Sequence, residues 1–323
     1  MLLPRFAVGT FSVGLMVTGA GVVSGQTYPN KPIYIVTAAP GGGVDFAARI
    51  IAQGLSGSLG QQVVVENRGG ASGAIAGARV ATAPPDGYTV LFYGNPFWIL
   101  PLLRNDVPYD PVRDFLPITL AYRSPNVLVV HPSLPVKSVR QLIALAKAKP
   151  GALNYATSGS ATASHLAAEL FNAKAGVNML RIPYKGAGLA FNDLISGEVQ
   201  LMFSPAASAM QHVKSGRLNG LAVTSAQPSA LAPGLPTIAA SGLPGFESIS
   251  MYAIFAPAKS PAERINRLHQ EIVRVLNRKD IKEKLFNTGS EVVATSPEQL
   301  AAAVKSEMAE LGKVIRDAGI RAD

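Results

Sequence analysis

The amino-acid sequence predicts an α/β protein built of two lobes. Short apolar runs typical of strands alternate with helix-like segments from Pro32 onward, and they form two successive series. This alternation is characteristic of parallel strands covered by helices. The length of 323 residues agrees with two domains of about 150 residues each. The 31 glycines and 24 prolines spread along the chain predict tight turns between short elements.

The first series contains three predicted strands, over residues 33–38, 62–66 and 88–93. The first strand ends at the turn 40–43, and apolar residues then recur at helical spacing over 47–55. The second strand is followed by the small-residue segment 68–73 and a further helix. The turn 84–87 introduces the third strand.

The second series starts near Asn126. It contains five predicted strands with helices between them, over residues 127–131, 153–157, 179–182, 199–204 and 218–224. The helix over 139–149 is preceded by Ser138, and Gln141 follows three residues later, which is the spacing of a capping box. Residues 225–248 lose the pattern and are rich in Pro, Gly and Ser, as in a connector.

The last part of the chain is predicted to contain one strand, over 252–255, and two closing helices. Ser260, Pro261 and Glu263 combine an N-cap, a proline at the first helical position and a reciprocal acid. The segment 296–299 repeats this device before the second helix. Periodicity alone does not assign this part of the chain to either lobe.

The first 25 residues have the three-part pattern of a secretory signal. One cation, Arg5, precedes the uncharged stretch 7–23, and small residues lie at the −3 and −1 positions before Gln26. The alternative is a retained transmembrane anchor, but several glycines weaken such a helix and no basic cluster follows it. We therefore expect a soluble mature chain in the periplasm of a bacterium with two membranes.

Signatures of enzymes and of metal sites are missing from the sequence. The absence of cysteine excludes disulfides, thiolate zinc sites, iron–sulfur clusters and cysteine nucleophiles. The segment 41–46 begins like a dinucleotide loop but has Phe46 where close helix–strand packing needs a small residue. No phosphate-binding loop and no G-x-S-x-G elbow occur. The four histidines are isolated, so no metal and no cofactor are expected, and His165 is interpreted as a packed structural residue.

The formal net charge of +9 suggests nucleic-acid binding, but the placement of the charges does not support it. The cations between Lys259 and Lys284 alternate with acidic residues opposite an apolar helix face, and aromatic residues are not interleaved with them. This pattern is typical of a solvated helix surface, so no nucleic-acid partner is expected.

Three loops of small residues, each between a strand and a helix, are the strongest positive signal. They cover residues 40–44, 69–73 and 157–162. Without bulky side chains in the way, a ligand reaches the backbone N–H groups, and the positive end of the helix macrodipole favours an anion. Two such loops on opposing lobes would hold the two ends of a dicarboxylate. The alternative is tight turning from strand to helix alone.

These loops also carry a family resemblance. The segments APGGGVDFAAR (39–49), VVVENRGGASGAIAGA (63–78), NYATSGSATASHLAAELF (154–171) and NDLISGEVQLMF (192–203) resemble the Bug family. These are the extracytoplasmic, TctC-like solute-binding proteins of tripartite tricarboxylate transporters. The resemblance implies a type II periplasmic-binding-protein fold with a ligand cleft between its lobes. Residues 26–125 plus 251–323 would form one lobe and residues 126–250 the other, with a hinge near 124–127 and 249–252.

The resemblance also implies where the ligand binds. A carboxylate is expected at the backbone amides of the first loop, and a second carboxylate at the loop 157–162. Asp45 would shape the first loop or receive an amino group of the ligand. Phe97 and Trp98 would either line the cleft, favouring an aromatic acid, or belong to the core. The candidate ligand-binding residues are Pro40, Gly41, Gly42, Gly43, Val44, Asp45, Ala71, Ser72, Asn95, Trp98, Thr157, Ser158, Gly159, Ser160, Ala161, Thr162, Tyr184 and Ser204.

Three positions, Ala161, Ala240 and Met251, depart from the family pattern and affect the expected shape of the pocket. The implied function is that of a periplasmic receptor that closes on a small carboxylate: a di- or tricarboxylate, an acidic amino acid or an aromatic acid. It would deliver this ligand, as a monomer, to the integral-membrane subunits of a transporter. The alternatives are a ligand-sensing subunit of a signalling system and an enzyme that acts on an organic acid through His165 or Ser158.

Overall fold

The computed structural model describes residues 28–158, 162–184, 186–317 and 319–320. The predicted secretory signal, and Gly159, Ser160 and Ala161 of the third loop, lie outside these residues. No helix of the described part is long and apolar enough to cross a membrane.

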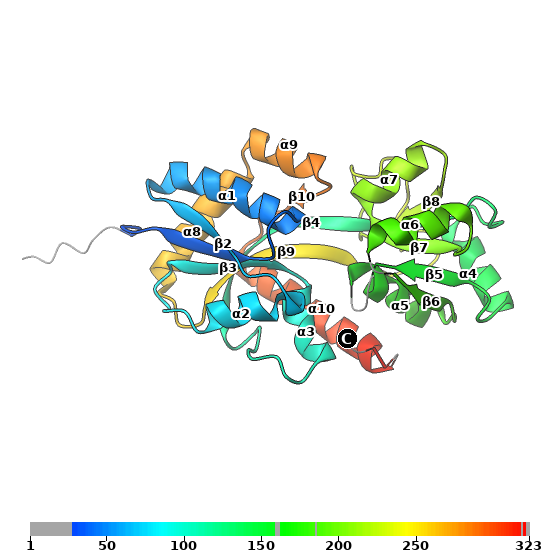
Figure 1. The fold of residues 1–323 in the computed structure, drawn as a ribbon, viewed down its shortest axis with the longest axis horizontal. Helices are drawn as coiled ribbons and strands as arrows, with labels where there is room; N and C mark the ends of the chain where they lie inside the picture. Colours follow the sequence, from blue (N-terminus) through cyan, green and yellow to red (C-terminus); the bar gives the residue numbers. More distant parts are fainter. Residues whose placement is uncertain (1–27, 159–161, 185, 318, 321–323) are drawn as a thin grey trace, which may run out of the picture.

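Among the described residues, ten strands are hydrogen bonded to one another in two sheets; eight of them form one continuous path, and the other two pair with β4 beside it. The first sheet contains β2 (Val63–Asn67), β1 (Ile33–Thr37), β3 (Thr89–Gly94), β9 (Ile249–Pro257), the first half of β4 (Phe115–Val130) and β10 (Glu291–Val292). The second sheet contains the other half of β4 with β8 (Asn219–Val223), β7 (Leu201–Pro205), β5 (Asn154–Thr157) and β6 (Leu180–Pro183). Figure 1 shows one lobe around each sheet, joined by β4 and β9; we call them the first and the second lobe.

Helices cover both faces of each sheet. In the first lobe, α1 (Gly43–Leu59), α8 (Ala262–Leu276) and α9 (Lys279–Asn287) share a core on one face. On its other face lie α2 (Ala74–Ala81), which the short η1 (Ala71–Gly73) precedes, α3 (Pro96–Leu103) and α10 (Pro297–Asp317). In the second lobe, α4 (Val139–Ala148) and α5 (Ala163–Ala175) cover one face, and α6 (Ala187–Ser196) and α7 (Ala206–Lys214) the other. The predicted α/β class is therefore confirmed.

The strand directions determine where the two lobes present their loops. β4 runs from the first sheet into the second. In the first lobe it is antiparallel to β9, which is antiparallel to β3, so β1, β2 and β3 all point toward the second lobe. In the second lobe β7 is antiparallel to β4 and parallel to β5, and β5 is parallel to β6, so these strands point toward the first lobe. The carboxyl ends of both parallel sets therefore meet across the gap between the lobes.

Two strands, β4 and β9, extend well beyond the segments that the apolar pattern predicts. The pattern predicts only 127–131 and 252–255. The additional residues pair with each other where the chain crosses between the lobes, for example Arg123 with Met251 and Pro125 with Ile249. Because both crossing strands are antiparallel to a neighbour, the sheets are mixed and not purely parallel. The crossing coincides with the expected hinge, and hinge motion stays a prediction.

The C-terminal helix α10 packs into cores of both lobes. Its apolar stripe in a core of the first lobe consists of Leu300, Val304, Leu311 and Ile315. Val314 of the same helix lies in a core of the second lobe together with residues of α5. Across the same boundary, Lys174 of α5 forms an ion pair of 2.7 Å with Glu310. Figure 1 shows α10 running from beneath the first lobe to α5. The predicted lobe boundaries stay a prediction, and α10 contacts both lobes.

The predicted helix caps are partly confirmed. Ser138 and Ser296 each accept a hydrogen bond of 3.3 Å from the backbone N–H three residues later. The prediction at Ser260 is wrong, because its hydroxyl donates to the carbonyl oxygen of Pro257 and α8 starts without a side-chain cap. In the described part, three helices follow β9, not the two that periodicity predicts.

Candidate functional site

Six helices begin where the parallel strands end, at the gap between the lobes. α1, α2 and α3 follow β1, β2 and β3, and α5, α6 and α7 follow β5, β6 and β7. Thr162 caps α5 with its side chain, whereas no side chain in the described part caps the helices that begin after Gly42, Gly73, Asn95, Gly186 and Pro205. The first N–H groups of a helix have no partner within the helix. The gap therefore offers N–H donors and positive dipole ends from both lobes, which favours an anion.

Asp45 holds the first loop in shape. The other candidate residues of this loop are exposed or half-buried: Pro40, Gly41, Gly42, Gly43 and Val44. The buried carboxylate of Asp45 accepts hydrogen bonds from the N–H of Gly41 (3.0 Å), Nε of Arg49 (3.1 Å) and Nδ2 of Asn67 (2.7 Å). Burial by itself raises the pKa of Asp45, but these hydrogen bonds outweigh burial and lower the pKa below its usual range. Both carboxylate oxygens are engaged, which supports a loop-shaping role over contact with a ligand amine.

The second loop has an unusual backbone conformation. Ala71 and Ser72 have φ angles of 44° and 52°, in the left-handed region, and Gly73 has a φ of 99°. A Cβ at Gly73 would lie 2.6 Å from the ring of Tyr93, so glycine is needed for this loop to pack on β3. Backbone strain of this kind concentrates at binding sites.

The described ends of the third loop are hydrogen bonded at the start of α5. Oγ1 of Thr162 accepts a hydrogen bond from the N–H of His165 (3.4 Å) and lies 2.9 Å from the Ser164 hydroxyl. The Ser158 hydroxyl lies 3.5 Å from the same Ser164 oxygen. Thr157 is fully buried and accepts a hydrogen bond of 3.2 Å from an arginine of β6. His165 is buried, in agreement with its interpretation as a packed residue.

Two further candidates, Tyr184 and Ser204, lie in the second lobe. The Tyr184 hydroxyl donates to the carboxylate of Asp193 at 2.8 Å. Ser204 is fully buried near the carboxyl end of β7, and within the described residues its Oγ has no hydrogen-bond partner.

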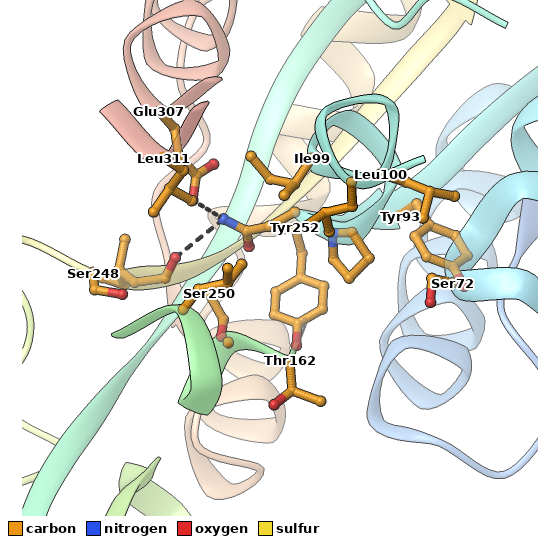
Figure 2. Close-up of a pocket in the computed structure, with 16 residues that line it drawn as sticks. Ser72, Tyr93, Ile99, Leu100, Thr162, Ser248, Ser250, Tyr252, Glu307 and Leu311 are labelled. Carbon is orange, nitrogen blue, oxygen red and sulfur yellow. Dashed lines mark hydrogen bonds between the residues drawn. The ribbon is translucent and has the colours of Figure 1, made fainter. Parts of the chain in front are cut away.

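A cavity of about 260 Å³ lies between the lobes, beside the crossing of β9 (Figure 2). Its walls come from η1, β3 and α3 of the first lobe, from the start of α5, and from β9 and α10. The cavity brings together three of the candidate residues, Ser72, Asn95 and Thr162. The other described candidates do not line it. These are the six residues 40–45 of the first loop and, elsewhere in the chain, Ala71, Trp98, Thr157, Ser158, Tyr184 and Ser204.

Phe97 and Trp98 belong to the core of the first lobe and not to the cavity wall. Both side chains are fully buried. The ring of Phe97 stacks on Tyr109 with centroids 4.9 Å apart, and the indole N–H of Trp98 donates to Oε2 of Glu307 at 2.6 Å. Of the two alternatives for these aromatic residues, the structure supports the core.

Glu307 is a cavity residue that the sequence pattern did not identify. It lies on α10, and its carboxylate accepts hydrogen bonds from Asn95 and Trp98. Burial raises the pKa of Glu307 to about 7; the two hydrogen bonds oppose this rise, and the nearby Glu310 and Glu247 add to it. The sequence signal that could have identified Glu307 is an acidic residue on the otherwise apolar face of α10.

Asn95 connects three elements at the crossing. Its Nδ2 donates to Glu307 of α10 and to the carbonyl oxygen of Ile249 on β9 (3.2 Å), as the dashed lines in Figure 2 show. Its Oδ1 accepts the N–H of Met251. Its own N–H donates to the carbonyl oxygen of Met251 at 3.1 Å. Met251, one of the departures from the family pattern, lines a second cavity of about 260 Å³ together with Glu307 and Arg123. The predicted ligand-binding residue Asn95 thus also holds the crossing strand.

Residues 47–320 match the protein family described as the tripartite tricarboxylate transporter family receptor. Among curated proteins, the chain is 39% identical over 292 residues to the UPF0065 protein in the tcbD-tcbE intergenic region of Pseudomonas sp. (strain P51), covering 90% of this chain and 87% of that protein. It is 35% identical over 315 residues to Protein BugT of Bordetella pertussis, covering 96% and 97% of the two chains.

Solved structures resemble the chain over nearly its whole length. R. palustris Rpa4515 with adipate is 35% identical with a TM-score of 0.74, covering 92% of this chain and 100% of that one. A TctC solute binding protein from Polaromonas is 26% identical with a TM-score of 0.83, covering 90% and 100%. MatC (Rpa3494) from Rhodopseudomonas palustris with bound malate is 27% identical with a TM-score of 0.71, covering 89% and 100%.

Proposed function

The chain belongs to the tripartite tricarboxylate transporter receptor family, and on this basis we propose that it is a periplasmic receptor that binds a small carboxylate between its two lobes. The resemblance of its loop motifs to the Bug family is borne out by the similarity to BugT. The fold class expected from that resemblance, two α/β lobes of a periplasmic binding protein, agrees with the solved relatives.

One observation carries the proposal: six helix N-termini face the gap between the lobes, and five of them lack a side-chain cap in the described residues. A hydrogen bond to a charged partner contributes about 1.5–3 kcal/mol. A negative charge at a helix N-terminus gains a further 0.3–1 kcal/mol or so from the macrodipole. A few such contacts from each lobe are enough to bind a carboxylate without a cationic side chain.

Two solved relatives support a carboxylate as the ligand, because one was solved with adipate and another with malate. The crossing of β4 and β9 would serve as the hinge. A ligand that contacts both lobes only in the closed state stabilises that state. The closed receptor would act as a monomer and present its ligand to integral-membrane subunits of a transporter. Residues 1–25 would direct the chain to the periplasm and be removed.

A receptor agrees better with the two potentially reactive side chains than an enzyme does. His165 is only 3% exposed and its Nε2 lies 3.8 Å from Glu169. The Ser158 hydroxyl faces the Ser164 hydroxyl and not an imidazole. Family membership points the same way.

A thermal-shift screen of mono-, di- and tricarboxylates against the purified mature chain tests the proposal. A ligand at about 100 times its Kd should stabilise the native state by about 2.7 kcal/mol. If uncharged or cationic solutes shift the melting temperature and no carboxylate does, the proposal is wrong.

Gly43 offers a sharper test because it is the first helical residue of α1, after the extended Gly42. Proline is tolerated at this position and would remove one N–H donor while keeping the helix. We expect Gly43→Pro to weaken carboxylate binding roughly 10- to 100-fold, as for one charge-assisted hydrogen bond. Gly43→Ala keeps the N–H, and its Cβ meets no atom within 4 Å, so it is the matched control. Equal affinities of the two variants would argue against binding at α1.

A further inference from the structure

The cavity beside Glu307 has an apolar wall and a polar end. Its apolar wall includes Pro96, Ile99, Leu100, Leu103, Leu166 and Leu311. Ser72 of the second loop and Thr162 of the third loop also line it, together with Tyr93 and Tyr252 (Figure 2). Because the walls come from both lobes, the shape of this cavity depends on how the lobes are arranged.

The composition of α3 is explained by this cavity. The helix is apolar on all sides, and four of its residues, Phe97, Trp98, Ile99 and Leu100, are buried. One side of α3 packs Phe97 and Trp98 into the core of the first lobe. Another side presents Ile99, Leu100 and Leu103 to the cavity; Ile99 and Leu100 are buried and Leu103 is half-buried.

The volume fits a small organic group. An apolar cavity of about 150 Å³ is enough to bind benzene, and the cavity here is larger, about 260 Å³. It accommodates a single aromatic ring or a short saturated chain. A carboxylate attached to that group would reach the polar end, toward Thr162 and the start of α5.

The charges around the cavity disfavour a second carboxylate in it. In the described part of the chain, no lysine or arginine lines the cavity, and Glu307 is its one carboxyl group. Glu247 and Glu310 lie near Glu307 and add negative potential, while Arg123, on the side of the second cavity, is paired with Glu291 at 3.5 Å. A like charge placed against Glu307 would raise the free energy of the complex, and such repulsive elements determine specificity.

We propose that this cavity is the specificity pocket of the ligand site and that it selects a monocarboxylate with an apolar body, either an aromatic ring or a short saturated chain. The carboxylate lies at the helix N-termini of the gap and the apolar body against α3 and α10. The proposal rests on the proposed function, and it narrows the ligand class from carboxylates in general to amphipathic monocarboxylates.

Calorimetric titration with matched ligand pairs tests the proposal. Hexanoate and adipate share a six-carbon chain and differ by the second carboxylate, and benzoate and terephthalate differ in the same way. We expect each monocarboxylate to bind at least tenfold more tightly than its dicarboxylate partner. Adipate or terephthalate binding as tightly as its partner would overturn the proposal.

Two variants connect the preference to this cavity. Ala163 lines it at the start of α5, so Ala163→Leu fills part of it, and we expect hexanoate and benzoate to bind at least tenfold more weakly. Ala303 lines the second cavity instead, so Ala303→Leu is the matched control with unchanged affinity. Glu307→Gln removes the like charge, and the ratio of adipate affinity to hexanoate affinity should rise severalfold. Unchanged affinity in Ala163→Leu, with the melting temperature of the free protein retained, would contradict the proposal.

The outcomes separate this proposal from the proposed function. Binding of compact dicarboxylates that Gly43→Pro weakens and Ala163→Leu does not would overturn the specificity pocket and leave the carboxylate receptor standing. Binding of no carboxylate at all would overturn both.

Discussion

Asn95, the residue at which α3 begins, is hydrogen bonded to Glu307 of α10, 212 residues further along the chain, beside the crossing of β9. The same amide is bonded to both Ile249 and Met251 of β9. One side chain therefore holds a helix of the first lobe, the crossing strand and the helix shared by the lobes. A change in the angle between the lobes has to be accommodated around this contact.

Asn95→Ala should lower both stability and ligand affinity. Leaving buried donors and acceptors unpaired costs about 1–3 kcal/mol per group, so we expect the free energy of unfolding in urea to fall by roughly 3 kcal/mol. Asn172→Ala is a matched control, because it removes two similar bonds to Met179 far from the crossing. It should reduce stability and leave affinity unchanged. Equal effects of both variants on affinity would contradict a hinge role for Asn95.

Glu307 should make the protein less stable as the pH rises toward neutrality. Its pKa is about 7 in the folded protein against 4.5 for the free side chain, so the folded state binds the proton more tightly. The resulting stabilisation is fully present below pH 4.5 and is lost as the pH rises through about 7. It amounts to roughly 3 kcal/mol at about 1.4 kcal/mol per pH unit. Urea titrations between pH 4.5 and 8 should show this decline, and Glu307→Gln should remove it while Glu310→Gln does not.

Ligand binding near neutral pH should take up protons. The apolar body of the ligand, lying against α10, removes water from Glu307, and this desolvation favours the neutral form of the side chain. The calorimetric binding enthalpy at pH 7 should therefore vary with the ionisation enthalpy of the buffer, with a positive proton uptake that disappears in Glu307→Gln. Binding without proton exchange would place the ligand away from Glu307.

Asp45→Asn should destabilise the first loop in a pH-dependent way. Hydrogen bonds to a charged group contribute about 1.5–3 kcal/mol, so we expect a loss of about 2 kcal/mol at pH 7. The lowered pKa of Asp45 means that this stabilisation is present above the unfolded value of 3.8 and is lost as the pH falls through the folded value. The difference between wild type and variant should shrink in acid. Asp86→Asn, which breaks an exposed pair with Lys31, should cost less than about 1 kcal/mol.

Gly289→Ala should weaken ligand binding by disturbing a contact between the lobes. Gly289 has a φ of 83°, and a Cβ there would lie 2.5 Å from Cβ of Ala207 on α7. Gly216 has a φ of 70° with no atom within 4 Å of the added Cβ, so Gly216→Ala introduces the same backbone strain of about 1–2 kcal/mol without the clash. Both variants should lose stability, but only Gly289→Ala should change affinity and the radius of gyration in solution scattering. Identical affinities would indicate that the lobes do not need this contact.

The sequence predicts the strands that are short, apolar and bounded by turns, and it fails where prolines interrupt a strand. Pro117 and Pro125 lie within β4, whose register shifts after Pro117 to accommodate the first of them. α3 shows no helical period because it is apolar on all sides, with a proline inside. The Ser260 hydroxyl donates to the carbonyl oxygen of Pro257 and does not cap α8. The capping pattern in the sequence does not reveal this competing hydrogen bond.

The sequence predicts the residues of the candidate site that lie on loops at strand ends. It does not predict those that a distant helix brings to the site through tertiary packing. Small residues at the strand ends identified Ser72 and Thr162, which the structure brings together in one cavity. Glu307 and Leu311 reach the same cavity from α10, and no local pattern connects them to α3 or α5. Glu307 lies three residues after Val304 and four before Leu311, within the buried stripe, so an acid in an apolar stripe was the available clue.

The position of β9 has a consequence for how the chain assembles during synthesis. β9 lies between β3 and β4 in the sheet, although it follows both in the chain. Until residue 257 has been made, β3 and the first half of β4 each present an unpaired edge, the kind of edge that invites aggregation. The cores of the second lobe are built almost entirely from residues between the second half of β4 and Phe246, and among the described residues only Val314 of α10 comes from later in the chain. We therefore expect the second lobe to fold first. The part of the first lobe that precedes it in the chain cannot complete its sheet until β9 is synthesised, and we expect chaperones to protect it until then.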